Sequence, residues 1–270
     1  LAACRDEKDQ SQVQEQIDYL KKKYQAGIEL LLTPMMDVSS SDIRQMVQYG
    51  MDISSLVPPG VKEYIHEHRL YLTKENANIH AIKKEVKLHL DSDRYEHTLG
   101  VMYTAASLAM CYGEDIEKAM TAGVLHDCAK GIPNSKKIKL CEKYQIEVTE
   151  SEKKNPELLH AKLAYMAVHK YHVGDETIAQ AITSHTTGRP GMTLLEKIIY
   201  IADFIEPGRK EIPKLDEIRR MSFQNIDQAL FTILENSLAY LRTRDKVIDP
   251  ITEKTYLYYK DLFEKRTEEA

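Results

Sequence analysis

The spacing of apolar residues limits the fold of this chain more than any other feature of its sequence. Between Asn225 and Arg242 apolar residues recur at three- and four-residue steps, which places them on one face of a helix and favours a role in a bundle core. The same period marks four other long segments, 95–112, 115–130, 157–171 and 194–205. Strands are expected only near the start, around 27–32. The pattern predicts a mainly α fold.

The composition indicates a folded protein and limits the kinds of partner that it is expected to bind. Apolar residues make up 43% of the 270 residues and charged residues 29%, which is typical of a globular chain that buries its own core. The net charge of −5 argues against nonspecific binding to nucleic acid or to an anionic membrane. An anionic ligand would therefore need a local cluster of positive groups or a metal ion.

The cysteines and the hydropathy of the sequence indicate in which cellular compartment the protein is expected. The four cysteines form no CxxC pair and no pairing rhythm, which is typical of reduced thiols and not of a disulfide framework or a zinc ribbon. The sequence has no apolar run of transmembrane length, and its first residues lack a signal-peptide core. We expect a soluble, cytoplasmic protein.

A boundary is expected within residues 71–80, where the polar segment LTKENANIH shows no apolar period. The stretch before it has a different pattern and includes the turn-forming Pro58-Pro59-Gly60. Nearly continuous helix is expected after it. We therefore predict two parts, a small α/β segment at 1–72 and a helical domain at 79–265.

The dipeptide His126-Asp127 ends an apolar segment and is the first candidate for chemistry. An ionised Asp127 next to apolar residues would cost several kcal/mol unless a cation compensates it. Imidazole nitrogen and carboxylate oxygen are both good ligands for first-row transition metals. A helix-capping pair with a satisfied core histidine is the simpler interpretation of the dipeptide alone.

Two further residues strengthen the metal hypothesis. His97 lies in a helix that is otherwise rich in apolar and small residues, and Asp203 is a carboxylate in the middle of the apolar segment LLEKIIYIADFIEP. Each alone is most simply a hydrogen-bonded structural residue. Together with His126 and Asp127 they give the order H…HD…D, which resembles the ligand order of HD-domain metal-dependent phosphohydrolases.

The resemblance extends to six segments in register between about 79 and 262: RYEHTLGV, HDCAKGIP, LLHAKLAY, SHTTGRPGM, YIADFIEPGR and VIDPIT. They resemble the YqeK-type symmetrical bis(5′-nucleosyl)-tetraphosphatases, an all-helical HD-domain family that splits diadenosine tetraphosphate into two ADP. One departure is Asp249 in VIDPIT, where the family more often carries a histidine. That departure concerns the loop expected to contact the nucleoside.

The resemblance assigns the metal to four residues, His97, His126, Asp127 and Asp203. This ligand set suits an octahedral iron or manganese site with open positions for water and phosphate, and the resemblance favours iron. The sequence leaves open whether one or two metal ions bind.

The resemblance also implies residues that contact the substrate. Beside His97, Asp127 and Asp203, the expected contacts are Arg94, His160, His185, Thr186 and Arg209. Catalytic roles are expected for Asp127, which could orient a water, and for Lys130, which could reach a phosphate as a point charge. A solvated lysine at a helix end is the alternative for Lys130, and Arg189 is interpreted as a loop charge.

The stretch from about 12 to 72 is similar to a different family. Its element Ser39-Ser40-Ser41-Asp42-Ile43-Arg44 and the following VP…YI tail resemble the C-terminal end of a NadD-type nicotinate-mononucleotide adenylyltransferase. Hydroxyls and free N–H groups at a helix start make an anion site, and Arg44 could hold a triphosphate. A serine-rich helix cap over a buried stripe is the simpler interpretation. The glycine-rich first half of that family is missing, so we interpret 1–72 as a truncated transferase tail.

The leading hypothesis is a metal-dependent hydrolase that cleaves diadenosine tetraphosphate symmetrically and releases ADP. Alternatives are a natural bifunctional fusion with the adenylyltransferase of NAD biosynthesis, hydrolysis of another phosphorylated nucleotide, or a nucleotide sensor with a structural metal. Homodimer formation is left open.

Overall fold

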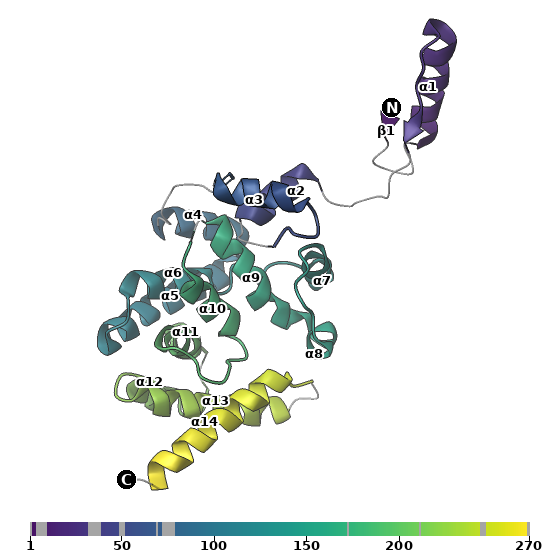
Figure 1. The fold of residues 1–270 in the computed structure, drawn as a ribbon. Helices are drawn as coiled ribbons and strands as arrows, with labels where there is room; N and C mark the ends of the chain where they lie inside the picture. The colour runs from purple at the N-terminus through teal and green to yellow at the C-terminus, as the bar shows by residue number, and fades with distance from the viewer. Residues whose placement is uncertain are drawn as a thin grey trace.

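The computed structural model describes residues 2–3, 10–31, 39–48, 52–68, 70–71, 79–171, 173–210, 212–243 and 247–268. The N-terminal part contains β1 (Ala2–Ala3), α1 (Gln10–Tyr24), β2 (Leu30–Leu31), α2 (Ser40–Gln48) and α3 (Pro59–Glu67). The rest is helical: α4 (Ile79–His89), α5 (Ser92–Tyr112), α6 (Ile116–Leu125), α7 (Asn134–Lys143), α8 (Glu150–Lys154), the 3₁₀ turn η2 (Pro156–Leu158), α9 (Leu159–Lys170), α10 (Glu176–Ser184), α11 (Leu194–Ile205), α12 (Leu215–Ser222), α13 (Ile226–Arg242) and α14 (Pro250–Glu268). The prediction of a mainly α fold is confirmed (Figure 1).

The helices begin and end where their capping residues lie. Asp91 accepts a hydrogen bond from the Arg94 N–H and begins α5, and Gly113 in the left-handed conformation ends it. Thr193 and Glu196 form a reciprocal capping box at the start of α11. These local signals fix the two helices that carry much of the site described below.

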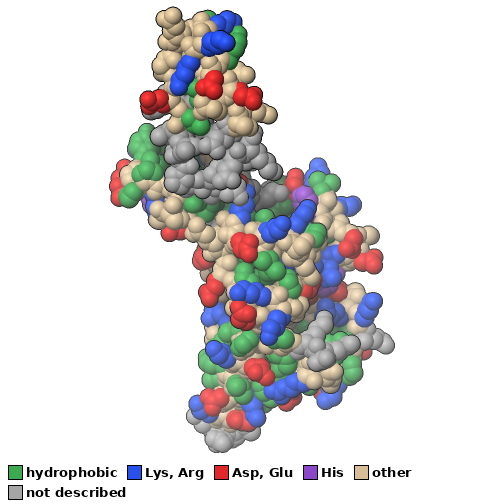
Figure 2. Space-filling view, turned by 90° about the vertical axis from the view of Figure 1, so that its right-hand side faces the viewer, with side chains coloured by type: hydrophobic (Ala, Val, Ile, Leu, Met, Phe, Trp, Pro, Cys, Tyr) green, Lys and Arg blue, Asp and Glu red, His purple; other side chains and the backbone are tan. Residues whose placement is uncertain are grey.

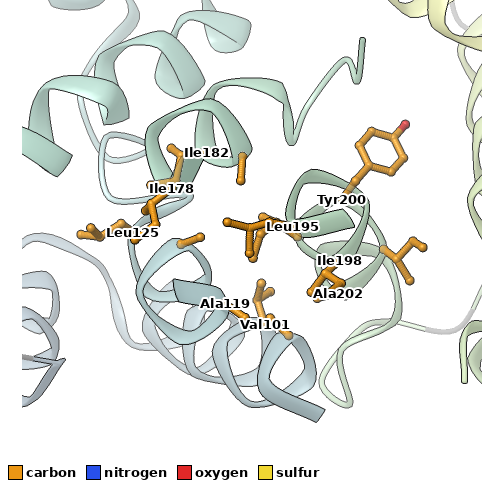
Figure 3. Close-up of a cluster of buried hydrophobic side chains, with 14 of the residues drawn as sticks. Val101, Ala119, Leu125, Ile178, Ile182, Leu195, Ile198, Tyr200 and Ala202 are labelled. Carbon is orange, nitrogen blue, oxygen red and sulfur yellow. The ribbon is translucent and has the colours of Figure 1, made fainter. Parts of the chain in front are cut away.

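The core of the helical part lies among α5, α6, α10 and α11, which pack closely on one another. Their buried apolar side chains meet in one cluster, part of which is drawn in Figure 3 with Val101, Leu125, Ile182 and Ile198 labelled. A Cβ at Gly123 would lie 2.8 Å from the Cα of Met102, so α6 approaches the α5 backbone at a distance that only glycine permits. This close approach brings the end of α6 next to α5.

Two predicted helices differ at their ends. The helix expected over 115–130 ends at Leu125, because Cys128 and Lys130 make hydrogen bonds to the carbonyls three residues earlier and wind the chain into turns. The helix expected over 157–171 begins as the 3₁₀ turn η2 and becomes α9. Both departures lie where side chains enter the site.

Two strands lie in the described residues of the N-terminal part, and β1 pairs in parallel with β2 at Ala2–Leu30 and Ala3–Leu31. β2 falls within the segment expected to form a strand. Figure 1 draws α1 apart from the other helices, whereas α2 and α3 contact the helical part. The contact buries Met46 and Ile65 against Tyr144 of the loop after α7.

The predicted boundary at 71–80 includes residues 72–78, which lie outside the described residues. The division into 1–72 and 79–265 therefore stays a prediction. Among the described helices, none combines the length and the apolar character that crossing a bilayer requires. Figure 2 shows acidic and basic side chains interspersed over one face of the molecule, so the net charge does not gather there.

Candidate active site

Four histidines from different elements point the same ring nitrogen, Nε2, at a common centre. Their Nδ1 atoms are held from behind by oxygen acceptors. His126 Nδ1 lies 2.7 Å from the Gly123 carbonyl oxygen. The corresponding distances are 2.6 Å from His160 to the Glu157 carbonyl, 2.6 Å from His185 to the Ile182 carbonyl and 3.1 Å from His97 to Glu206 Oε1. Because an oxygen acceptor requires Nδ1–H, each neutral ring presents an Nε2 lone pair to the centre.

Two carboxylates face these nitrogens. Asp203 Oδ1 lies 3.0 Å from His97 Nε2 and 3.9 Å from His126 Nε2. Asp127 Oδ2 lies 4.0 Å and 3.7 Å from the same two nitrogens. The other oxygen of Asp127, Oδ1, lies 3.1 Å from His160 Nε2 and 3.6 Å from His185 Nε2. Asp127 thus stands between two pairs of histidines.

The burial and protonation of this centre fit a bound cation. The Nε2 atoms of His97 and His126 are buried and have no hydrogen-bond partner within the described part of the chain, although carboxylate oxygens lie 3.0–4.0 Å away. Burial lowers the pKa of His126 to about 4 and also lowers that of His160, so both imidazoles stay neutral near pH 7. Unpaired nitrogen lone pairs beside buried carboxylates are unfavourable unless a positive ion binds between them.

Ligand sets can be read from these distances. His97, His126 and Asp127 form one group of atoms close enough to share an ion, and Asp203 joins His126 and His185 in another. The predicted set of His97, His126, Asp127 and Asp203 is therefore brought together. Asp127, His160 and His185 form a further group. This third group leaves the number of bound ions open, as the sequence does.

The positively charged residues predicted for the substrate lie at the same place. Arg94 Nη1 is 2.9 Å from Asp127 Oδ2, and Arg209 Nη1 is 3.7 Å from Asp203 Oδ1. Lys130 Nζ lies 3.4 Å from His160 Nε2. They line one cavity of about 710 Å³ that is also lined by Asp127, His160, His185, Thr186 and Asp203. The structure thus brings all the predicted site residues together, with His97 and His126 beside the cavity-lining carboxylates.

Glu206 is a residue of the site that sequence reasoning missed. Its carboxylate is buried and accepts hydrogen bonds from His97 Nδ1 at 3.1 Å and from the Gly208 N–H at 2.6 Å. A Cβ at Gly100 would lie 2.5 Å from Glu206 Oε2, so this glycine makes room for the carboxylate. The available signal was an acid placed directly after an apolar helix, but nothing in the sequence connects it to His97, 109 residues earlier.

Arg189 and Asp249 have other roles than the sequence suggested. Arg189 is more than a loop charge, because its Nε and Nη2 each lie 2.6 Å from a carboxylate oxygen of the buried Glu196. Glu196 also accepts from Ser184 Oγ at 2.9 Å, so this pair fixes the loop after His185. Asp249 accepts from Ser151 Oγ at 2.7 Å and is not among the residues that line the cavity.

The serine-rich element at the start of α2 forms a helix cap. Ser39 Oγ accepts from the Asp42 N–H at 3.1 Å, and Asp42 Oδ2 accepts from the Ser39 N–H at 2.9 Å. Asp42 also pairs with Lys143 at 2.6 Å, and Arg44 lies over the ring of Tyr71. The simpler cap interpretation describes what these residues do, and the anion site stays a prediction.

Comparison with known proteins identifies related sequences. A family model described as the HD domain matches residues 94–208. A Bacillus subtilis protein named "Bis(5'-nucleosyl)-tetraphosphatase, symmetrical" is 43% identical over 174 residues, which cover 63% of this chain and 91% of that protein. A Mycoplasma pneumoniae protein named "Probable nicotinate-nucleotide adenylyltransferase/Ap4A hydrolase" is 32% identical over 186 residues, which cover 68% of this chain and 48% of that protein.

A solved structure has a similar fold. It is a Clostridium acetobutylicum protein described as a predicted HD superfamily hydrolase involved in NAD metabolism. The match has a TM-score of 0.64 and 37% identity, and it covers 68% of this chain and 98% of the other. Fold, site geometry and sequence similarity lead to one conclusion. The chain belongs to the HD-domain hydrolase family that contains the symmetrical bis(5′-nucleosyl)-tetraphosphatases.

Proposed function

We propose that this protein hydrolyses dinucleoside polyphosphates and cleaves diadenosine tetraphosphate into two molecules of ADP. The observation that carries the proposal is one cavity that combines a histidine–aspartate centre with three cationic side chains, Arg94, Lys130 and Arg209. A chain with a net charge of −5 needs such a local concentration to bind a polyphosphate. The name of the B. subtilis relative supports the substrate and the symmetrical cleavage.

The group that this centre would hold is a transition metal ion, most simply iron, with manganese as the alternative. His97, His126, Asp127 and Asp203 would be its ligands, because nitrogen and carboxylate oxygen together suit such ions. When bound, the ion supplies Lewis-acid polarisation of a phosphoryl oxygen and lowers the pKa of a water molecule.

The residues of the chain would perform the other tasks. Arg94 and Arg209 can each hold two phosphate oxygens through the guanidinium fork, and Lys130 adds a point charge. They would offset the negative charge that develops on the phosphates during cleavage. Asp127 Oδ1 faces His160 and His185 beside the cavity, where it can accept a hydrogen bond from the attacking water and orient it.

We also propose that residues 1–72 are the C-terminal end of an adenylyltransferase part. The serine-rich element and the VP…YI tail support this origin, as does the double name of the M. pneumoniae relative, of which this chain covers 48%. A bifunctional natural protein follows from that interpretation.

Product analysis tests the main proposal. The purified chain is incubated with diadenosine tetraphosphate and Mn²⁺ or Fe²⁺, and the nucleotides are separated by ion-exchange chromatography. ADP as the only product is expected. AMP together with ATP would refute symmetrical cleavage, and unchanged substrate with retained nucleotide binding would indicate a sensor.

A further inference from the structure

The cavity of the active site has a second, chemically different lining. Beyond the charged residues already described, its walls include apolar side chains from three places: Phe204 of α11, Ile212 and Pro213 of the following loop, and Leu241 of α13. Arg209 lies at the junction, because its guanidinium is 3.7 Å from Asp203 and lies over the Phe204 ring at 5.8 Å. A ligand held at the charged end would therefore place an apolar, flat portion against this second set.

One polar side chain on the same wall, Asn236, has no hydrogen-bond partner among the described residues. The side-chain amide of Asn236 is half-buried, lines the cavity and makes no hydrogen bond to any residue that the structure describes. Its neighbour Ser237 is different, because its hydroxyl is already hydrogen-bonded to the buried Tyr200. Asn236 and Tyr240 are one turn apart on α13, so the amide stands beside an aromatic side chain on the same wall.

We propose that this wall is an adenine-binding subsite in which Asn236 reads the edge of the base; this inference rests on the proposed function for the charged end. An amide offers one acceptor and donors side by side, which matches the N6 amino group and the adjacent ring nitrogen of adenine. Asn236 faces the N7 edge of the base, where guanine instead presents two acceptors, N7 and O6, and does not match an amide. The apolar side chains would contact the faces of the base.

Binding of ADP, GDP and inorganic pyrophosphate separates the base from the phosphates. Affinities are measured by isothermal titration calorimetry with Mn²⁺ on the full chain and on Asn236→Leu, which keeps the side-chain shape but loses the amide. We expect the variant to bind ADP about 10- to 100-fold more weakly, the discrimination of a good bidentate base contact, and pyrophosphate as the parent does. The control is Gln228→Leu, on the exposed side of the same helix, which should bind all three ligands as the parent does.

A second variant tests the direction of recognition. Asn236→Asp keeps an acceptor for the N6 amino group but loses the donor to N7, so ADP binding should weaken by at least about tenfold. GDP, which presents only acceptors at this edge, should bind no better than to the parent. Unchanged ADP binding in Asn236→Leu would overturn the subsite, as would equal losses for ADP and pyrophosphate. Hydrolysis of diadenosine tetraphosphate is measured separately. If the parent binds ADP through Asn236 but forms no ADP, the proposed function fails and the subsite stands.

Discussion

Replacing Glu206 by glutamine removes one charge and almost no volume. Among the described residues, Glu206 is the side chain that anchors the Nδ1 atom of one of the four histidines, His97. The carboxylate accepts from two buried donors, His97 Nδ1 at 3.1 Å and the Gly208 N–H at 2.6 Å. Glutamine has one carbonyl oxygen, so one of these donors faces an NH₂ group. Either the Gly208 N–H loses its partner, or His97 moves its proton to Nε2 and blocks the lone pair that faces the metal.

The two outcomes are expected to cost similar amounts of free energy. A buried donor left without an acceptor costs about 1–3 kcal/mol. Loss of a partner behind a metal-binding histidine typically lowers metal affinity about 10- to 100-fold, equivalent to about 1.4–2.7 kcal/mol. We therefore expect Glu206→Gln to bind Mn²⁺ about 10- to 100-fold more weakly, with nearly unchanged helical content.

Competition with a fluorescent chelator measures this affinity, and circular dichroism checks the fold. The control is Glu235→Gln, which makes the same chemical change at an exposed position of α13. Parental metal affinity in Glu206→Gln would refute the reasoning. A lower Tm with unchanged metal affinity would assign Glu206 to stability alone.

Further predictions concern the rest of the site and the N-terminal part. Arg209→Lys keeps the positive charge but loses the two-pronged guanidinium. In steady-state kinetics, kcat/KM for diadenosine tetraphosphate should therefore fall about 10- to 100-fold, while the metal content stays unchanged. If both Arg209→Lys and Arg209→Ala have parental kinetics, Arg209 does not contact the substrate. Burial lowers the pKa of His97, but Asp203 and Glu206 outweigh it and raise that pKa above its ordinary value. Protonated His97 cannot bind metal, so the affinity for Mn²⁺ should be highest at alkaline pH and should fall as the pH drops through the pKa of His97. A Mn²⁺ affinity that does not change between pH 5 and 8 would contradict the role of His97 as a ligand. Removal of residues 1–72 should leave metal content and kcat unchanged, because every proposed metal ligand lies after residue 72. It should lower the Tm, because Tyr144 loses its contacts with Met46 and Ile65. A shortened protein that is folded and metal-loaded but inactive would show that the two parts depend on each other.

The sequence predicts which residues come together in the histidine–aspartate centre, because their residue types are unusual at their positions in the sequence. His126-Asp127 and a lone Asp203 in an apolar helix are anomalous wherever the helices pack, so they can be recognised without a structure. Glu206 and Asn236 are ordinary residues by type. Glu206 matters because it lies next to His97, and Asn236 matters because its amide lines the cavity without a hydrogen-bond partner among the described residues. Both relations arise only when the helices pack.

The helix periods are equally informative, and the departure at 115–130 has a physical cause. α11 begins and ends where the apolar pattern does, since its capping box and the following Pro207 and Gly208 are local signals. The segment 115–130 instead changes from helix to turns at His126, with apolar residues continuing on both sides. Periodicity cannot show this change, because the burial pattern of the turn resembles that of the helix it replaces.

The way in which the four imidazoles are anchored has a consequence for how the protein can change over evolutionary time. His126, His160 and His185 are each held by the carbonyl three residues earlier, an atom that every amino acid supplies. The side chains at Glu157 and Ile182 are therefore not what directs His160 and His185, whereas Gly123, which holds His126, is fixed by its close approach to Met102. His97 alone depends on a side chain, and that side chain needs the space left by Gly100. We therefore expect positions 97, 100 and 206 to be epistatic: a substitution at one of them should be harmful alone but tolerated when the other two positions change with it.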